Sequence, residues 1–351
     1  MAMDLRGYAA TSAKDALAPY TLTRRDPRAD DVVIEILYCG VCHSDLHQAR
    51  NDWGNSTYPM VPGHEIIGRV VSVGAKVKRF KAGDHAGVGC MVDSCQHCAA
   101  CEQGLEQYCE EFPTFTYNAM DRRDQRPMFG GYSEKIVVSD KFVLKIPKGL
   151  DLKAAAPLLC AGITTWSPLR HWNVGKKSKV AVIGLGGLGH MALKLVHALG
   201  ADVTLLTRSP GKEQDARRLG AHQVVLSTNE KQMAAVKAKF DLIIDTVPYK
   251  HDLNPYLPTL SLNGTLVIVG FLGGLEPVLN TVSLIMGRKA VAGSVIGGIA
   301  ETQEMLDFCG KHGITSDVEV INIQNINEAY ERMLRSDVKY RFVIDMASLK
   351  I

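Results

Sequence analysis

The sequence predicts a two-domain α/β protein that combines a β-rich domain with a doubly wound parallel sheet. Its 351 residues are too many for one ordinary core, because domains usually run about 100 to 200 residues. Residues 31–147 consist of short strand-like runs separated by glycine and turn residues. From about residue 154, continuous apolar runs alternate with helical segments, which is typical of a parallel sheet covered by helices.

Composition and charge exclude several classes of protein. Hydrophobic residues make up 46% and charged residues 22%, as in globular proteins rather than disordered or fibrous ones. Lys and Arg total 40 against 37 Asp and Glu, so a net charge of +3 predicts no nucleic-acid partner and no anionic membrane surface. The N-terminus has no apolar signal-like region, and no run of 18 apolar residues occurs, so we expect a cytoplasmic protein outside the membrane.

The elements of the first domain are expected in the strand-like runs VVIEILYCG, GRVVSVG, HAGVGC, YSEKIVVSD and KFVLKIP, which together suggest a barrel-like arrangement. A helical segment, AAPLLCAGITTWSPL, begins the region in which strands and helices alternate. Its strands and helices are expected in KVAVIGLGGLGHMALKLVHALGA, DVTLLT, KEQDARRLGA, HQVVLS, FDLIIDTV and GTLVIVG. The closing run KYRFVID resembles a strand that returns to the first domain.

Four of the nine cysteines fall in one short window, spaced Cys-x2-Cys-x2-Cys-x7-Cys, namely Cys95, Cys98, Cys101 and Cys109. An odd number of cysteines excludes a complete disulfide framework, and four close thiolates are typical of a structural zinc site. Four unliganded buried thiols are one alternative. An iron–sulfur cluster is the other, but its fourth cysteine would follow after three residues and precede a proline, whereas Glu110 follows Cys109.

A second, open metal site is expected from Cys42 in CGVCHSDLH, His64 in PGHE and Cys160 in LLCAGIT. Two thiolates and one imidazole form a catalytic zinc set that leaves a fourth position for water or substrate. The residues leave alternatives open, because Cys39 and Cys42 form another Cys-x2-Cys pair, and buried cysteines with a core histidine would look the same.

Polar neighbours of these ligands suggest supporting roles. Asp45 is expected to orient His64, since ligand histidines usually donate their second N–H to an oxygen. An Asx-turn or a helix N-cap is the alternative for Asp45. Ser44 and His47 could carry a proton from an alcohol to water, and the alternative for His47 is an exposed helical histidine. Glu65 could reach the metal when the water leaves.

The run KVAVIGLGGLGH matches a dinucleotide-binding fingerprint, with strand, glycine turn and helix in the required order. Gly184 permits the tight turn, Gly186 lets the backbone approach a pyrophosphate, and Gly189 allows the helix to pack closely. Free N–H groups at the helix start bind phosphate. The turn residues expected to contact the cofactor are Gly184, Leu185, Gly186, Gly187, Leu188 and Gly189.

The end of the next strand favours NADP over NAD. NAD enzymes place a carboxylate there for the ribose 2′-hydroxyl, but DVTLLT ends without one. Hydroxyls and cations suit a 2′-phosphate instead. The residues are Thr207, Arg208, Ser209 and Lys212, and a solvated basic helix start is the alternative.

Together the motifs resemble the zinc-dependent medium-chain alcohol dehydrogenases, most closely their cinnamyl-alcohol-dehydrogenase-like branch. The resemblance spans the chain through GVCHSDLH, PGHE, the four-cysteine segment, GGYSEKIVV, PLLCAGITT, GLGGLGH, GSVIGG and DVKYRFVID. It implies a GroES-like catalytic domain from residues 1–155 and 296–351, a Rossmann domain from residues 156–295, two zinc ions per chain and a homodimer.

The resemblance also implies residue roles. It assigns the catalytic zinc to Cys42, His64 and Cys160 with Glu65 as alternative ligand, the structural zinc to the four-cysteine segment, and a proton relay to Ser44 and His47. It adds cofactor contacts at Thr164, Val269, Gly270, Ser294, Val295, Ile296 and Arg341. Trp53, Phe115 and Val295 resemble substrate-pocket walls, with core packing as the alternative for the two aromatic residues. Val295 stands where relatives commonly carry phenylalanine, which should widen the pocket.

The expected function is NADP(H)-dependent interconversion of primary alcohols and aldehydes, aliphatic and aromatic, with a small-molecule substrate as partner. Two alternatives are a polyol or secondary-alcohol dehydrogenase on the same fold and a non-catalytic NADPH-binding protein with structural zinc alone.

Overall fold

The computed structural model describes residues 3–270 and 273–350, which divide into two compact units. One unit contains Met1–Cys160 and Gly297–Ile351, and the other contains Ala161–Ile296. Both ends of the chain therefore belong to the first unit. Among the described residues, no helix is long and apolar enough to cross a membrane.

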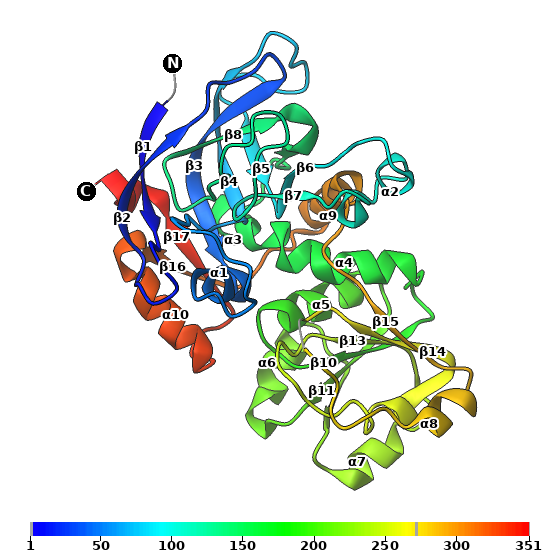
Figure 1. Ribbon diagram of the computed structural model, residues 1–351. Helices are drawn as coiled ribbons and strands as arrows, with labels where there is room; N and C mark the ends of the chain where they lie inside the picture. Colours follow the sequence, from blue (N-terminus) through cyan, green and yellow to red (C-terminus); the bar gives the residue numbers. More distant parts are fainter. Residues whose placement is uncertain (1–2, 271–272, 351) are drawn as a thin grey trace. The chain divides into compact units, whose positions relative to one another are not determined.

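The first unit is built on a largely antiparallel sheet in the order β16-β17-β3-β4-β5-β9, with β8 also paired to β3. Its long strand β3 (Asp31–Val41) is rich in β-branched residues and is buried along most of its length. The expected return of the C-terminal run is confirmed, because β17 (Arg341–Asp345) pairs antiparallel with β3 (Figure 1). The other strands are β4 (Ile66–Val73), β5 (His85–Val88), β8 (Lys135–Ser139), β9 (Leu144–Lys145) and β16 (Val318–Asn322).

Smaller elements complete this unit. A hairpin of β1 (Met3–Ala9) and β2 (Ala18–Arg24) and a short ribbon of β6 (Met91–Asp93) and β7 (Thr114–Phe115) lie outside the main sheet. The expected strand KFVLKIP is only partly formed, because a 3₁₀ turn at Asp140–Phe142 precedes β9 and Pro147 follows it. The helices are α1 (His43–Ala49), α2 (Ala99–Glu102), α3 (Leu152–Ala155), α9 (Ile299–His312) and α10 (Ile326–Leu334).

The second unit is a six-stranded parallel sheet in the order β12-β11-β10-β13-β14-β15. Chain order reverses beside β10, because β11 lies on one side of it and β13 on the other, and such a switch point forms a ligand crevice at the carboxyl ends of the strands. The strands are β10 (Lys179–Ile183), β11 (Asp202–Thr207), β12 (Gln223–Leu226), β13 (Phe240–Asp245), β14 (Leu260–Ile268) and β15 (Ala290–Gly293). The helices are α4 (Ala161–His171), α5 (Gly187–Ala198), α6 (Glu213–Arg218), α7 (Glu230–Ala235) and α8 (Thr281–Ile285).

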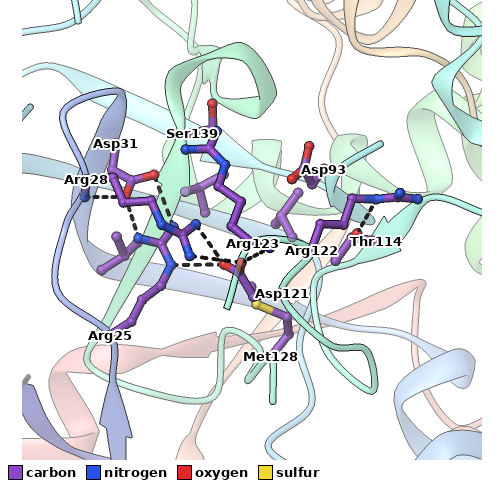
Figure 2. Close-up of a pocket in the computed structure, with 13 residues that line it drawn as sticks. Arg25, Arg28, Asp31, Asp93, Thr114, Asp121, Arg122, Arg123, Met128 and Ser139 are labelled. Atoms are coloured by element: carbon purple, nitrogen blue, oxygen red, sulfur yellow. Dashed lines mark hydrogen bonds and ion pairs between the residues drawn. The ribbon is translucent and has the colours of Figure 1, made fainter. Parts of the chain in front are cut away.

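An ion-pair network ties two segments of the first unit that are distant in sequence. Asp121 accepts hydrogen bonds from Arg25 at 3.0 Å and from Arg28 at 2.9 and 3.0 Å, and Arg25 also bonds Asp31 (Figure 2). Both aspartates are buried. The network therefore anchors the loop around Asp121 to the start of β3.

Candidate functional site

Four metal-binding side chains from distant parts of the first unit meet in one buried cluster, which consists of Cys42, His64, Glu65 and Cys160. Their ligand atoms all lie within 4.8 Å of one another. Cys42 is the N-cap of α1, His64 and Glu65 directly precede β4, and Cys160 follows the 3₁₀ turn Ala156–Leu159. All four are buried.

The donor set and its spacing fit zinc. The sulfurs of Cys42 and Cys160 are 3.9 Å apart. Two thiolates bound tetrahedrally at about 2.3 Å from one zinc ion would be about 3.8 Å apart. One carboxylate oxygen of Glu65 is buried and has no hydrogen-bond partner among the described residues. Cys39, the alternative ligand, lies outside this cluster.

The surroundings shift the pKa values of Cys42 and Glu65 in opposite directions. A hydrogen bond with the Cys160 thiol lowers the pKa of Cys42 well below its ordinary value; burial opposes the shift, and the charge of Arg341 adds to it. Burial raises the pKa of Glu65 to about 7, although Arg341 opposes this. Arg341, from β17, is itself buried and donates a hydrogen bond to Glu65. The structure thus places Arg341 against the metal cluster.

Asp45 holds His64 in one orientation. The carboxylate of Asp45 is fully buried and lies 2.9 Å from Nδ1 of His64. It also accepts hydrogen bonds from the backbone N–H groups of Gly63 at 3.0 Å and Cys42 at 2.9 Å. Because Nδ1 of His64 donates to Asp45, Nε2 is left for a metal ion.

The two expected relay residues lie on α1 beside the cluster. The Ser44 hydroxyl is 3.7 Å from the Cys42 sulfur. His47 is partly exposed, and its Nδ1 lies 2.7 Å from a carboxylate oxygen of Asp52. Sequence reasoning missed Asp52, because an aspartate in the polar segment NDWG has no distinguishing spacing. The expected relay of Ser44 and His47 therefore has a carboxylate partner, Asp52, bonded to the ring of His47.

The second thiol cluster contains the four closely spaced cysteines Cys95, Cys98, Cys101 and Cys109. Their sulfurs lie within 4.8 Å of one another, and those of Cys95 and Cys101 are 3.8 Å apart. Backbone N–H groups point at the sulfurs, including Cys98 N at 3.3 Å from Cys95. This spacing fits one tetrahedral zinc ion, whereas cluster thiolates bind separate iron atoms.

The glycine turn after β10 has the geometry that a dinucleotide needs. Gly184 has a φ of +88°, which favours glycine. A Cβ on Gly189 would come within 2.2 Å of the Gly184 carbonyl oxygen, so only glycine lets α5 pack this closely. A Cβ on Gly186 would meet no atom within 4 Å, which leaves open space at the start of α5.

The end of β11 lies beside this turn, because β10 and β11 are neighbouring parallel strands. Thr207 is buried and its hydroxyl oxygen accepts a hydrogen bond from Ser209 N at 3.2 Å. Arg208 and Ser209 are exposed and Lys212 is partly exposed. Neither cation forms an ion pair within residues 3–270 and 273–350. The two charges are thus free to meet an anionic ligand.

The remaining expected contacts are distributed over both units. Thr164 is buried in α4, Val269 and Gly270 follow β14, and Ser294, Val295 and Ile296 follow β15. The last five therefore lie at the same carboxyl-end edge of the sheet as the glycine turn. In the first unit, Trp53 is 37% and Phe115 43% exposed, which disagrees with core packing.

A dinucleotide-type sheet together with a buried metal-binding cluster of two cysteines, a histidine and a glutamate defines a metal-dependent dehydrogenase. Residues 28–148 match the alcohol dehydrogenase GroES-like domain, and residues 187–311 match the zinc-binding dehydrogenase family. The chain belongs to the zinc-dependent medium-chain alcohol dehydrogenases, in their cinnamyl-alcohol-dehydrogenase-like branch. The predicted GroES-like and Rossmann α/β fold is confirmed.

Similar proteins cover the full length of the chain. Aldehyde reductase YahK of Escherichia coli (strain K12) is 53% identical over 99% of both chains. The NADP-dependent alcohol dehydrogenase C of Mycobacterium bovis is 51% identical over 97% of this chain and 98% of its own. A crystal structure of the cinnamyl alcohol dehydrogenase of Helicobacter pylori complexed with NADP(H) is 42% identical over 99% of both chains, with a TM-score of 0.92.

Proposed function

We propose that this protein is an NADP(H)-dependent zinc alcohol dehydrogenase, or aldehyde reductase, acting on primary alcohols and aldehydes of broad aliphatic and aromatic range. The observation that carries the proposal is the buried cluster of Cys42, Cys160, Glu65 and the Asp45-oriented His64. Relatives named as NADP-dependent alcohol dehydrogenase and aldehyde reductase support the cofactor and the reaction. Nine free cysteines favour a reducing compartment, and we assign the enzyme to the cytoplasm.

The two units divide the work in this proposal. Residues 1–160 and 297–351 form the catalytic domain, and residues 161–296 bind the cofactor. Cys42, His64 and Cys160 would hold a zinc ion that polarises the substrate oxygen. Glu65 would be the alternative ligand. Cys95, Cys98, Cys101 and Cys109 would hold a second zinc ion that stabilises their loop.

Ser44 and His47 move the proton, and Asp52 supports His47. Ser44 lies beside the ligand Cys42. Its hydroxyl group accepts the proton of the substrate hydroxyl group while its own proton passes on towards His47. His47 stands nearer the surface, where its imidazole exchanges protons with water. Asp52 bonds the ring of His47 and holds its orientation. In aldehyde reduction, the same groups deliver the proton to the product oxygen.

Cofactor choice is assigned to the end of β11. Thr207, Arg208, Ser209 and Lys212 would surround the 2′-phosphate of NADP, and no carboxylate stands there to bind a free 2′-hydroxyl. Replacing Lys212 with glutamate should raise the Michaelis constant for NADPH about tenfold or more while leaving that for NADH unchanged or lower. Lys177→Glu, at the amino-end edge of the same sheet, makes the same charge change and should alter neither value.

The reaction is tested by following NADPH oxidation by absorbance with benzaldehyde, cinnamaldehyde and butanal. The proposal expects turnover with all three and a strong preference for NADPH over NADH. Faster oxidation of sorbitol-like polyols than reduction of any aldehyde would favour the polyol dehydrogenase. Tight NADPH binding without turnover of any substrate would favour the non-catalytic protein.

We also propose a homodimer formed through the edge strand β15. This strand ends the parallel sheet, and unpaired edges are natural sites for association. Highly exposed apolar side chains lie in the segment before it, namely Val278, Val282, Ile285 and Met286. Ile285→Asp should shift the sedimentation coefficient from that of a dimer to that of a monomer. Val320→Asp, on the edge strand β16 of the other unit, should leave the dimer intact.

A further inference from the structure

The segment that leaves β13 forms one wall of the glycine turn. The Thr246 hydroxyl donates a hydrogen bond to the Ile183 carbonyl oxygen at 2.7 Å, and the Thr246 backbone N–H bonds the same oxygen at 3.1 Å. A Cβ on Gly184 or Gly189 would lie 3.2 Å from the Thr246 hydroxyl oxygen. The position of residues 246–247 therefore shapes the crevice that we assign to the cofactor pyrophosphate.

A buried ion pair fastens this segment at its base. Asp245, the last residue of β13, is fully buried, and one of its carboxylate oxygens accepts a hydrogen bond from Val247 N at 3.2 Å. The other oxygen lies 3.2 Å from Nε2 of His251, and this contact is an ion pair when the imidazole is protonated. The pair closes the loop of residues 246–250.

The surroundings of His251 favour its charged form. Nδ1 of His251 donates to the Tyr249 carbonyl oxygen at 2.9 Å, so the proton on Nε2 is the one exchanged when the ring titrates. The Asp245 carboxylate raises the pKa of His251, burial opposes this, and Asp252 adds to the rise. Tyr249 and Tyr256 are the other titratable groups facing the ring, both as edge-on aromatic neighbours.

Deprotonation of His251 would change the charge beside the cofactor site. A buried carboxylate without a counter-charge is costly, and its field would act on the neighbouring turn, where a pyrophosphate carries negative charge. Segment 246–250 would also lose the contact that closes it. Both effects disfavour binding of an anionic dinucleotide.

We infer that the His251–Asp245 ion pair is a latch that positions the wall of the glycine turn and couples cofactor affinity to pH. The inference rests on the proposed cofactor site. His251 is a positioning residue, since it acts through Asp245 and the segment beyond it. Its raised folded pKa means that the latch is closed below the ordinary imidazole range and opens as pH rises through the folded value. NADPH affinity should therefore fall on the alkaline side, and by linkage NADPH binding should be accompanied by proton uptake there.

The test measures the dissociation constant of the binary NADPH complex by cofactor fluorescence from about pH 7 to about pH 9.5, where the 2′-phosphate is already ionised. For the wild type we expect about a five- to tenfold weakening across this range. His251→Gln should bind as weakly near pH 7 as the wild type does at high pH, with a flat profile. His222→Gln is the matched control, because His222 lies 3.7 Å from Asp202 at the opposite edge of the same sheet. It should keep the wild-type profile.

Calorimetry of the wild type in two buffers of different ionisation enthalpy provides a readout that needs no variant. Proton uptake on NADPH binding on the alkaline side of the ordinary imidazole range supports the latch, and its absence overturns it. Equal pH profiles for wild type and His251→Gln also overturn it while leaving the cofactor site in place. Failure of the wild type to bind NADPH would instead remove the proposed function.

Discussion

His47 lies at the outer end of the proposed relay, where Asp52 bonds its ring at 2.7 Å. General acid–base groups of this kind contribute about 10²- to 10⁴-fold to rate. His47→Gln should therefore lower kcat by about 10²-fold with little change in the dissociation constant of NADPH. Asp52→Asn, which keeps a hydrogen-bond acceptor, should lower kcat by less than about tenfold.

Steady-state kinetics with one aldehyde and fluorescence titration with NADPH check both expectations. His222→Gln, a histidine with an aspartate neighbour in the unit of residues 161–296, is the control and should keep the wild-type kcat. An unchanged kcat in His47→Gln would remove this residue from the relay.

At the residue scale, the sequence indicated side chains with distinctive chemistry and spacing. The structure brings Cys42, His64, Glu65 and Cys160 together, although 118 positions separate Cys42 from Cys160. Asp52 could not be predicted in the same way, because its role depends on where the chain after α1 turns. The Asp245–His251 pair could not be predicted either, since only the folded loop brings the two side chains together.

The loop of residues 95–109 contains two short helices, α2 and the 3₁₀ turn Glu106–Tyr108, with few buried side chains between its cysteines. Its shape must therefore depend on the metal. Cys98→Ser should release one zinc ion per chain and make this loop the first site of limited proteolysis. Cys309→Ser, a buried thiol outside both clusters, should retain both zinc ions, as metal analysis would show.

The network around Asp121 predicts a loss of stability in acid (Figure 2). Burial opposes ionisation, but hydrogen bonds and charges from Arg28, together with the charge of Arg25, lower the pKa of Asp121 to about 2. Because the folded pKa lies below the unfolded value of about 3.9, the stabilisation is complete above about pH 5 and is lost as pH falls through about 4 towards 2.

Denaturant unfolding of Asp121→Asn at neutral pH should show a free energy of unfolding lower by about 1–3 kcal/mol, because Arg25 and Arg28 each lose one of their two carboxylate partners. The difference from the wild type should shrink as pH approaches about 2, where the wild-type carboxylate is protonated as well. Asp124→Asn removes a more exposed partner of Arg28 and should cost less than about 1 kcal/mol. A difference for Asp121→Asn that stays constant with pH would contradict this account.

At the element scale, strongly apolar strands were predictable and tertiary details were not. FDLIIDTV forms β13 and VVIEILYCG forms most of β3, since their runs of β-branched residues allow few alternatives. KFVLKIP has a similar composition, yet only Leu144–Lys145 is a strand. Asp140 N donates to the Asp30 carbonyl oxygen, a contact between distant segments that starts a turn where the sequence suggests a strand.

At the scale of the whole molecule, the arrangement follows from two separate needs. A cofactor crevice needs a parallel sheet with a switch point, which residues 161–296 provide between β10 and β13. The metal cluster needs a rigid frame, and the chain builds it from an antiparallel sheet that incorporates its own C-terminal strand. The change from short strand-like runs to alternating apolar strands and helices predicted both domains. The glycine turn and the cysteine spacing predicted cofactor binding and metal binding.

The central claim is that the cluster of Cys42, His64, Glu65 and Cys160 does the chemistry, while the four-cysteine cluster only stabilises a loop. The most direct measurement compares zinc content and NADPH-dependent aldehyde reduction in Cys160→Ala and the wild type. We predict one zinc ion instead of two, NADPH binding within about twofold of the wild type, and turnover lower by about 10³-fold or more. Retained turnover in Cys160→Ala after loss of that zinc ion would contradict the account.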